Sequence, residues 1–215
     1  MRGVSARVFV LSPGRLDGAR AQHLLAPRGA PGELAAALRT REGAPIGDVY
    51  AYVSSLYFRG KRAYAARFAR PPEGAPWLAS GALVITPNRG LVPVTTRVCL
   101  EHLEAFAETD IAAGEPAFAR PMARDAAALA EAIGADGEVV LLGSVASPKY
   151  TTALLAALGG RLRFPSDFVG RGDMSRGGLL LRAVAAGEEL ATMAVADAVL
   201  RGKRPPKLDP KTRPK

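Results

Sequence analysis

The sequence predicts a single α/β domain whose mostly parallel sheet is flanked by helices. Short runs of apolar and β-branched residues alternate with segments in which apolar residues recur every three or four positions. Such alternation is typical of parallel sheets, because successive parallel strands need a crossover helix between them. The length of 215 residues and the apolar share of 48% suit one domain of moderate size with its own core.

The expected strands are apolar runs bounded by turn-forming residues. They cover residues 7–11, 82–86, 138–142, 161–164 and 191–195. The expected helices cover residues 33–38, 46–68, 100–108, 121–133, 147–158 and 177–186. We expect Gly60 to bend or divide the long helix, Pro121 to stand in a first helical turn, and Gly159 to end a helix. The chain is therefore divided into one domain, residues 1–200, and a tail, residues 201–215.

Composition excludes several classes of protein. The longest apolar stretch, residues 139–146, is far too short to span a bilayer, and the amino-terminal run 8–11 carries no cleavage signature. A single cysteine rules out an internal disulfide, and two histidines beside it supply no zinc-type cluster. We therefore expect a cytoplasmic protein with no membrane partner, no bound metal and no resident cofactor.

The net charge of +9 is concentrated at the carboxyl end of the chain. Residues 201–215 contain seven basic residues and one acidic residue, which leaves a net charge of +3 for residues 1–200. Because this basic tail holds four prolines and almost no apolar residues, we expect it to be disordered. It serves either as a solubilising end or as a loose electrostatic arm for DNA, RNA or an acidic partner.

The loops that follow the first four predicted strands are rich in glycine and in hydroxyl, amide and arginine donors. They cover residues 12–18, 86–93, 143–150 and 165–178. In a parallel sheet the carboxyl ends of the strands lie at one edge, and ligands bind there. The candidate anion- and ligand-binding residues are Ser12, Asn88, Arg89, Gly143, Ser144, Ser147, Lys149, Tyr150, Arg171, Asp173, Ser175 and Arg176.

The loop over residues 143–150 has the features of an anion site. Ser147 and Pro148 fit the N-cap and the first position of a helix. The free N–H groups of such a helix end attract negative charge, and Lys149 would add a full positive charge. The alternative is a well-capped turn between a strand and a helix, with no ligand.

The loop over residues 165–178 brings two arginines close to an acid in the sequence. Arg171 and Arg176 suit a phosphate or carboxylate group, and the glycines around them let the backbone approach a ligand. The alternative is an internal pair between arginine and Asp173 that braces the loop. If the protein is an enzyme, Asp173 or Asp48 is the candidate general acid or base.

Basic and aromatic residues interleave near the end of the long predicted helix. Arg59, Lys61 and Arg62 stand between Tyr57 and Tyr64. Proteins that bind single-stranded nucleic acid use such interleaving. More often the aromatic residues belong to the core while the charges form a solvated face, and we favour that interpretation here.

Three short motifs resemble those of the YaaA-type bacterial peroxide-stress proteins. The motifs are Leu11-Ser12-Pro13 with Asp17, Gly47-Asp48-Val49-Tyr50, and Arg89-Gly90-Leu91-Val92-Pro93. Residues 143–150 and 168–178 resemble a related bacterial α/β domain family, and residues 86–93 resemble the T-P-x-G-L-V-P run of archaeosine-synthase-like proteins. The resemblance implies an α/β fold and an association with DNA or with modified-base chemistry. It carries over no catalytic residue, because Arg15 stands where the YaaA-type family has lysine and residues 94–96 replace its P-Y-R segment.

Three functions remain open from the sequence. The first is binding of a nucleotide, a nucleobase or nucleic-acid phosphate at the edge of the sheet, with Lys149 and the arginines contacting the anion. The second is an enzyme that transfers a glycosyl or other group on a phosphorylated or nucleoside substrate, with carboxylates as acid or base. The third is a protein-interaction module whose loops are only well-capped turns.

Overall fold

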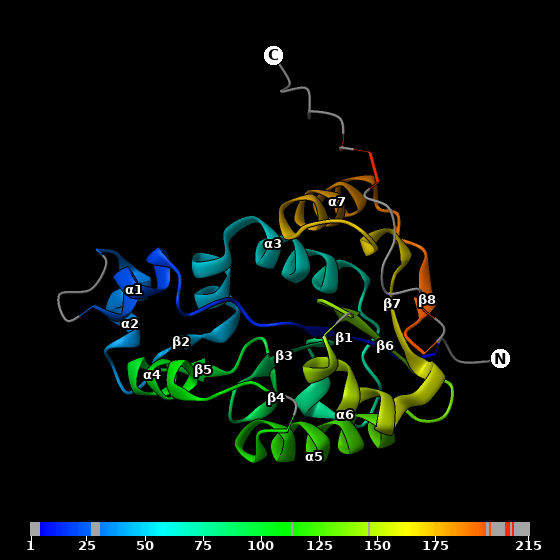
Figure 1. Ribbon diagram of the computed structural model, residues 1–215, viewed down its shortest axis with the longest axis horizontal. Helices are drawn as coiled ribbons and strands as arrows, with labels where there is room; N and C mark the ends of the chain where they lie inside the picture. Colours follow the sequence, from blue (N-terminus) through cyan, green and yellow to red (C-terminus); the bar gives the residue numbers. More distant parts are fainter. Residues whose placement is uncertain are drawn as a thin grey trace.

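The central sheet has six strands in the order β4-β3-β1-β6-β7-β8 (Figure 1). The computed structural model describes residues 5–26, 31–112, 114–145, 147–196, 198, 205–206 and 208. The strands are β1 (Arg7–Leu11), β3 (Ala82–Thr86), β4 (Gly90–Pro93), β6 (Glu138–Leu142), β7 (Leu162–Pro165) and β8 (Thr192–Ala194). The four inner strands are parallel, and the two edge strands β4 and β8 are antiparallel to their neighbours. The predicted fold class is therefore confirmed.

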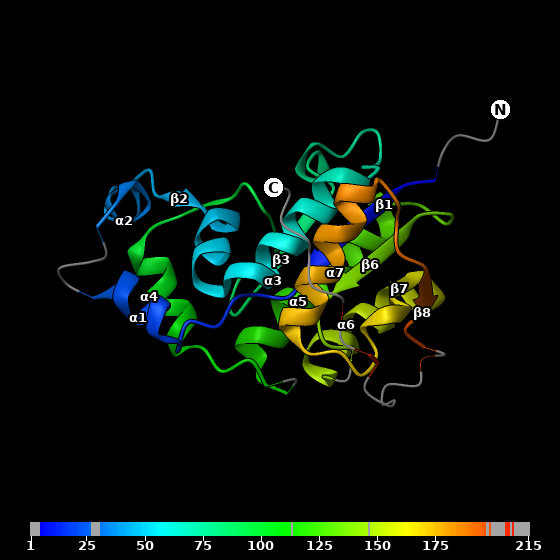
Figure 2. The ribbon, with the colours of Figure 1, turned by 90° about the horizontal axis from the view of Figure 1, so that it is seen from above.

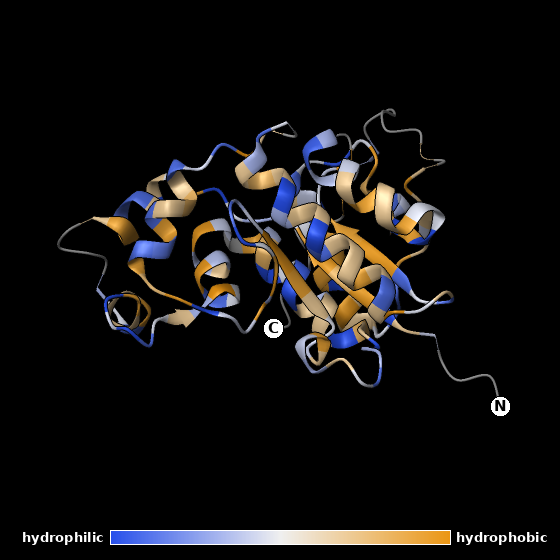
Figure 3. Ribbon diagram, turned by 90° about the horizontal axis from the view of Figure 1, so that it is seen from below, coloured by the Kyte–Doolittle hydropathy of each residue, from blue (hydrophilic) through white to orange (hydrophobic). Residues whose placement is uncertain are grey.

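The inner strands β1, β3 and β6 are almost entirely apolar because helices cover both faces of the sheet. In β1 every residue after Arg7 is buried, and all five residues of β3 are buried. Coloured by hydropathy, the strands form an apolar layer between the helices (Figure 3). β1 pairs with β6 over its whole length, from Arg7 opposite Glu138 to Leu11 opposite Leu142, so the carboxyl ends of these two strands are level.

Two pairs of helices cover the sheet (Figure 1). α3 (Ile46–Phe68) and α7 (Asp173–Ala186) pack together on one face, and α5 (Pro116–Ala132) and α6 (Pro148–Leu158) pack together on the other. A lateral group lies beyond the sheet edge that carries β4 (Figure 2). It consists of α1 (Ala19–Leu25), α2 (Glu33–Leu38), α4 (Leu100–Glu108) and the antiparallel pair β2 (Ala44–Pro45) and β5 (Arg97–Val98).

Glycines set the distance between α3 and α7. A Cβ atom on Gly177 would lie 2.8 Å from Tyr57 Cα, and one on Gly60 would lie 2.8 Å from the Gly177 carbonyl oxygen. The two helix backbones are therefore in direct contact at this crossing. The expected break at Gly60 is wrong, because α3 continues through it, and Gly60 serves the packing of helices instead.

Several expected element boundaries also differ from the structure. α5 begins at Pro116, where the Glu115 side chain accepts a hydrogen bond from the Ala117 N–H, so Pro121 lies inside the helix rather than in its first turn. α7 begins at Asp173, four residues before the expected start, which makes the end of the glycine-rich loop helical. Residues 90–93 form an edge strand and not a loop. The expected basic tail lies outside the described residues apart from residues 205, 206 and 208.

The contact between α3 and α7 yields the first prediction. Gly177→Ala should lower the free energy of unfolding by about 2 kcal/mol, because the added methyl group overlaps backbone atoms that cannot rotate away. Gly160→Ala is the matched control, since a Cβ there meets no atom within 4 Å. Urea unfolding of both variants measures the difference. A loss no larger at position 177 than at position 160 would contradict close packing of the two helices.

Candidate functional site

The topology opens a crevice at the carboxyl ends of β1 and β6. These strands are neighbours, but the chain leaves β1 toward β3 and leaves β6 toward β7, on opposite sides. α3 lies on one face after β1, and α6 lies on the other face after β6. Neighbouring connections that diverge in this way leave a hollow between them, the usual ligand site of an open parallel sheet.

A polar cavity of about 710 Å³ occupies this crevice. Its walls come from the segment after β1, the inner side of α3, the segment after β6, and the first turns of α6 and α7. The lining residues are Ser12, Pro13, Arg15, Asp17, Gly18, Val53, Ser54, Tyr57, Lys61, Ser144, Ser147, Lys149, Tyr150, Asp173 and Met174. Hydroxyl groups, two lysines and two carboxylates thus face one cavity, which is the chemistry of a polar ligand site.

Lys61 is the most unusual side chain of the polar cavity. Only 1% of it is exposed, and its Nζ donates hydrogen bonds to the Ser12 carbonyl oxygen at 2.8 Å and to Ser12 Oγ at 2.9 Å. Nζ also lies 4.1 Å from the centre of the Tyr57 ring. Among the described residues no carboxylate lies within ion-pair distance of it, so α3 holds a buried amine against the end of the central strand without a counter-charge.

Burial changes the protonation of Lys61. Loss of hydration lowers the pKa of Lys61 to about 7, and the positive charge of Arg176 adds to the effect while Asp173 opposes it. The face of the Tyr57 ring favours the charged form as well, but burial is the larger influence. At neutral pH the amine is therefore present in both its charged and its neutral form.

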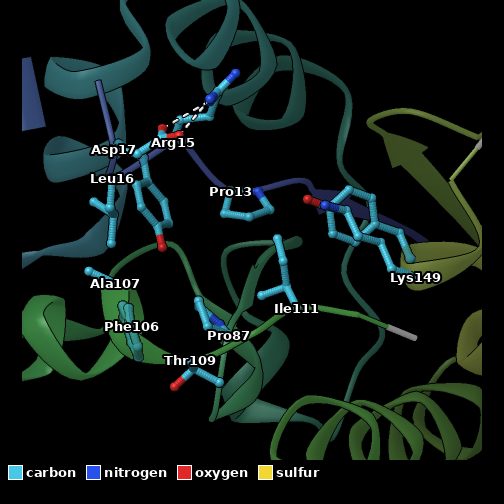
Figure 4. A pocket seen from close by; sticks show the side chains of 13 residues that line it. Pro13, Arg15, Leu16, Asp17, Pro87, Phe106, Ala107, Thr109, Ile111 and Lys149 are labelled. Atoms are coloured by element: carbon cyan, nitrogen blue, oxygen red, sulfur yellow. Dashed lines mark hydrogen bonds and ion pairs between the residues drawn. The ribbon is translucent and has the colours of Figure 1, made fainter. Parts of the chain in front are cut away.

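A second cavity of about 520 Å³ adjoins the first (Figure 4). Pro13, Arg15, Asp17, Lys149 and Tyr150 line both cavities. The remaining wall of the second cavity is mainly apolar, and it consists of Gly14, Leu16, Tyr50, Pro87, Phe106, Ala107, Thr109 and Ile111. We call the two hollows the polar cavity and the apolar cavity.

Tyr50 gives the apolar cavity one buried polar group. Its side chain is fully buried, and its hydroxyl makes no hydrogen bond within the described part of the chain. Burial also raises the pKa of Tyr50 well above its ordinary value, so the hydroxyl keeps its proton. It can donate to, or accept from, a polar edge of a ligand that is otherwise held by apolar contacts.

The structure gathers about half of the residues predicted for the site. Ser12, Ser144, Ser147, Lys149, Tyr150 and Asp173 all line the polar cavity. Gly143 lies at its base, where a Cβ would come within 2.9 Å of Ser12 Cβ, so glycine lets the ends of β1 and β6 approach each other. Ser147 stands at the N-cap position of α6 as expected, but its side chain does not cap the helix.

The two arginines of the last loop bind the protein itself. Arg176 donates from Nε and from a terminal nitrogen to the Phe168 carbonyl oxygen, at 3.2 and 3.1 Å, and lies 3.6 Å from Asp173. Arg171 donates to the Asp167 carbonyl oxygen at 3.0 Å and to Ser175 Oγ at 3.3 Å. Arg171 and Ser175 line a separate hollow of about 360 Å³, and neither lines the polar cavity. These contacts hold the loop together, and the ion pair between Arg176 and Asp173 is the internal pair that the sequence analysis gave as the alternative to an anion site.

Asn88, Arg89 and Asp48 lie outside both cavities. Asn88 Nδ2 donates to Thr109 Oγ1 at 3.2 Å, which fastens the β3–β4 turn to the end of α4, while the Arg89 side chain is exposed. Asp48 is paired with Arg62 on the outer side of α3. None of the three lines the polar or the apolar cavity.

Lys61 is the site residue that the sequence interpretation missed. We expected the charges of this helix to form a solvated face, and for Lys61 that expectation is wrong. Lys61 follows Tyr57 by four positions and precedes Tyr64 by three, so it belongs to the buried stripe of α3. A lysine in register with core aromatic residues was the signal available in the sequence.

Neither a metal cluster nor a membrane span is found in the described part of the chain. No group of three or more His, Cys, Asp and Glu side chains gathers there as metal ligands would. No described helix combines the length and the apolar character needed to cross a bilayer.

Burial of Lys61 yields the second prediction. The pKa of Lys61 is about 7 in the folded protein and near 10.5 in the unfolded chain, so between these values the unfolded chain binds more protons and stability rises with pH. Lys61→Met removes this titration. Between pH 7 and 9 the free energy of unfolding of the variant, relative to that of the wild type, should fall by about 2 kcal/mol.

Urea unfolding at several pH values measures this change, and Arg59→Met, an exposed position of the same helix, is the control that should show no such trend. A constant difference between Lys61→Met and the wild type from pH 7 to 9 would mean that the buried amine keeps an ordinary pKa.

The chain was also compared with known proteins. No protein-family model matches it, and searches of curated proteins and of solved structures likewise find no match. The function must therefore be argued from the site itself.

Proposed function

We propose that this chain binds a nucleotide, or a similar phosphorylated molecule with a flat ring, across the polar and apolar cavities. The observation that carries the proposal is the junction of two hollows of opposite character along one wall. A nucleotide has the same division, since its phosphate is strongly polar and its base has two apolar faces. The cavity volumes of about 520 and 710 Å³ fall within the range of small-molecule sites.

The phosphate would lie at the start of α6. Pro148 occupies the first position of this helix of 11 residues, and Lys149 follows it on the shared wall of the two cavities. The helix end and the lysine both favour an anion. Ser144 and Ser147 line the same part of the polar cavity and can donate hydrogen bonds to phosphate oxygens.

The base would lie in the apolar cavity. Tyr50 and Phe106 offer aromatic surface, and Leu16, Ile111 and Pro87 complete the apolar wall. Stacking on aromatic side chains suits any base, while the buried Tyr50 hydroxyl supplies one hydrogen bond to its edge. Asp17, on the shared wall, can accept from a ribose hydroxyl, although in the present arrangement its carboxylate pairs with Arg15 (Figure 4).

A second candidate is group transfer on the bound molecule. Asp173 favours it, because its carboxylate lines the polar cavity together with the amine of Lys61 while most of its own side chain stays exposed. An acid and an amine facing one cavity are the groups that general acid–base chemistry uses. This candidate needs the same binding site, so binding is the first property to test.

The third prediction concerns binding. In a thermal-shift screen, adenine and guanine nucleotides should raise the melting temperature, and much of the shift should persist at high salt because salt does not screen the apolar contacts to the base. Lys149→Ala should weaken binding about tenfold, since a hydrogen bond to a charged group contributes about 1.5 kcal/mol or more. Arg59→Ala removes an equal charge from the exposed side of α3 and should leave affinity unchanged.

Other outcomes would overturn this proposal in favour of the remaining hypotheses. A shift seen only with DNA or RNA, lost at high salt and lost when residues 201–215 are deleted, would assign binding to the basic tail. If neither nucleotides nor phosphorylated sugars change the melting temperature, the small-molecule hypotheses fail and the protein-interaction hypothesis remains. Equal losses for Lys149→Ala and Arg59→Ala would place the site away from the shared wall.

A further inference from the structure

We propose that Lys61 is a reactive amine that forms an imine with an aldehyde or ketone carbon of the molecule in the polar cavity. The proposal rests on the proposed function only in that the polar cavity must admit a small polar molecule. It names a covalent step and a substrate class, carbonyl compounds, that binding alone does not require.

The contacts of Nζ favour a nucleophile at this position. A neutral amine has two hydrogens and one lone pair, and Nζ has two acceptors, the Ser12 carbonyl oxygen at 2.8 Å and Ser12 Oγ at 2.9 Å. Ser12 Oγ in turn lies 3.5 Å from the Leu142 carbonyl oxygen, to which it can donate. With both hydrogens engaged by Ser12, the lone pair of the neutral amine takes no part in these bonds and stays free to attack.

The surroundings of Lys61 supply little compensation for a positive charge. The groups around it are Ser12 after β1, Tyr57 on α3, Asp173 and Arg176 on α7, and Lys149 and Tyr150 on α6 across the polar cavity. The only carboxylate near enough to act on it, among the described residues, is Asp173, and Asp173 lies 3.6 Å from Arg176. The pKa of Lys61, lowered to about 7, agrees with this arrangement.

The same surroundings distinguish a nucleophile from a general base. A base would end its step as an ammonium ion, buried and without a counter-charge, which the site disfavours. A nucleophilic amine starts neutral and ends as a neutral imine. Desolvated lysines next to another cationic group are activated in this way.

The step balances without any oxidant or reductant. The Nζ lone pair attacks the carbonyl carbon, the C=O π electrons move to oxygen, and one amine proton passes to that oxygen to give a carbinolamine. The second amine proton then leaves with the hydroxyl group as water, and the C=N bond forms. Asp173, on the wall of the polar cavity, is placed to carry protons between nitrogen and oxygen.

Trapping of the imine is the test and the fourth prediction. The native chain is incubated with glyceraldehyde 3-phosphate and samples are treated with sodium borohydride, whose hydride adds to the imine carbon while water supplies a proton to nitrogen. The product is a stable secondary amine, and modified lysines are located by peptide mass spectrometry. Lys61 should be modified at least tenfold faster than Lys149 at pH 7. Its rate should rise with a midpoint near pH 7, below which the amine is protonated.

The internal comparison between two lysines of one folded protein needs no variant. Lys61→Met should abolish the dominant adduct while Arg59→Met retains it, and a failure of Lys61→Met to fold would leave the comparison in native protein intact. Modification of Lys149 or of the tail lysines without Lys61 would overturn the proposal. So would a Lys61 rate with its midpoint near pH 10, because that is the behaviour of an ordinary solvated lysine.

The two proposals fail in different ways. Nucleotides that raise the melting temperature while Lys61 stays unmodified would keep the binding site and exclude the imine. Trapping at Lys61 with no nucleotide effect would keep the reactive amine and exclude nucleotide as the ligand class.

Discussion

The contact between Lys61 and Ser12 joins the two parts of the molecule on which the candidate site depends. It fastens the carboxyl-terminal half of α3 to the point where the central strand ends, and it does so with an amine that has lost nearly all contact with water. A methionine of similar length would fill the same space without the cost of desolvating a charge. A side chain that lowers stability at neutral pH and faces a cavity is best explained by the chemistry of that cavity.

The order of the strands then determines what surrounds the amine. Because β1 lies between β3 and β6, the segments that follow β1 and β6 diverge, and the crevice between them receives residues from four separate parts of the chain. Gly143 lets the strand ends come together at its base, and the glycine contact between α3 and α7 brings Asp173 to its rim. The position of the site is thus a consequence of the topology, and its chemistry is a consequence of a few side chains.

The sequence predicted the inner strands and the long helix well because their signals are local. Each of the ranges 7–11, 82–86 and 138–142 contains four consecutive apolar residues, and the three ranges form strands with the predicted bounds. The strand order depends on pairing between distant segments, which no local pattern encodes. The same limit applies to the site, since Ser144 and Lys149 could be assigned to the edge of the sheet, whereas the burial of Lys61 depends on the packing of α7 and the end of β1 around it.

The sequence predicted Arg171 and Arg176 as ligand contacts and Lys61 as a solvated charge, whereas in the structure the arginines brace a loop and Lys61 lines the polar cavity. This reversal has a physical reason. A guanidinium group carries five donors in a rigid plane, so it can satisfy several carbonyl oxygens of an irregular loop, and Arg171 and Arg176 do this. Two arginines among the glycines of residues 165–178 are therefore as typical of a loop that is braced by its own side chains as of an anion site. A lysine presents a single compact group on a flexible stem and loses its charge more easily when it is buried. Lys61 and Lys149 accordingly face the polar cavity beside Arg15, whose guanidinium group pairs with Asp17, so the two lysines are the groups that a substrate carbonyl and a phosphate could meet.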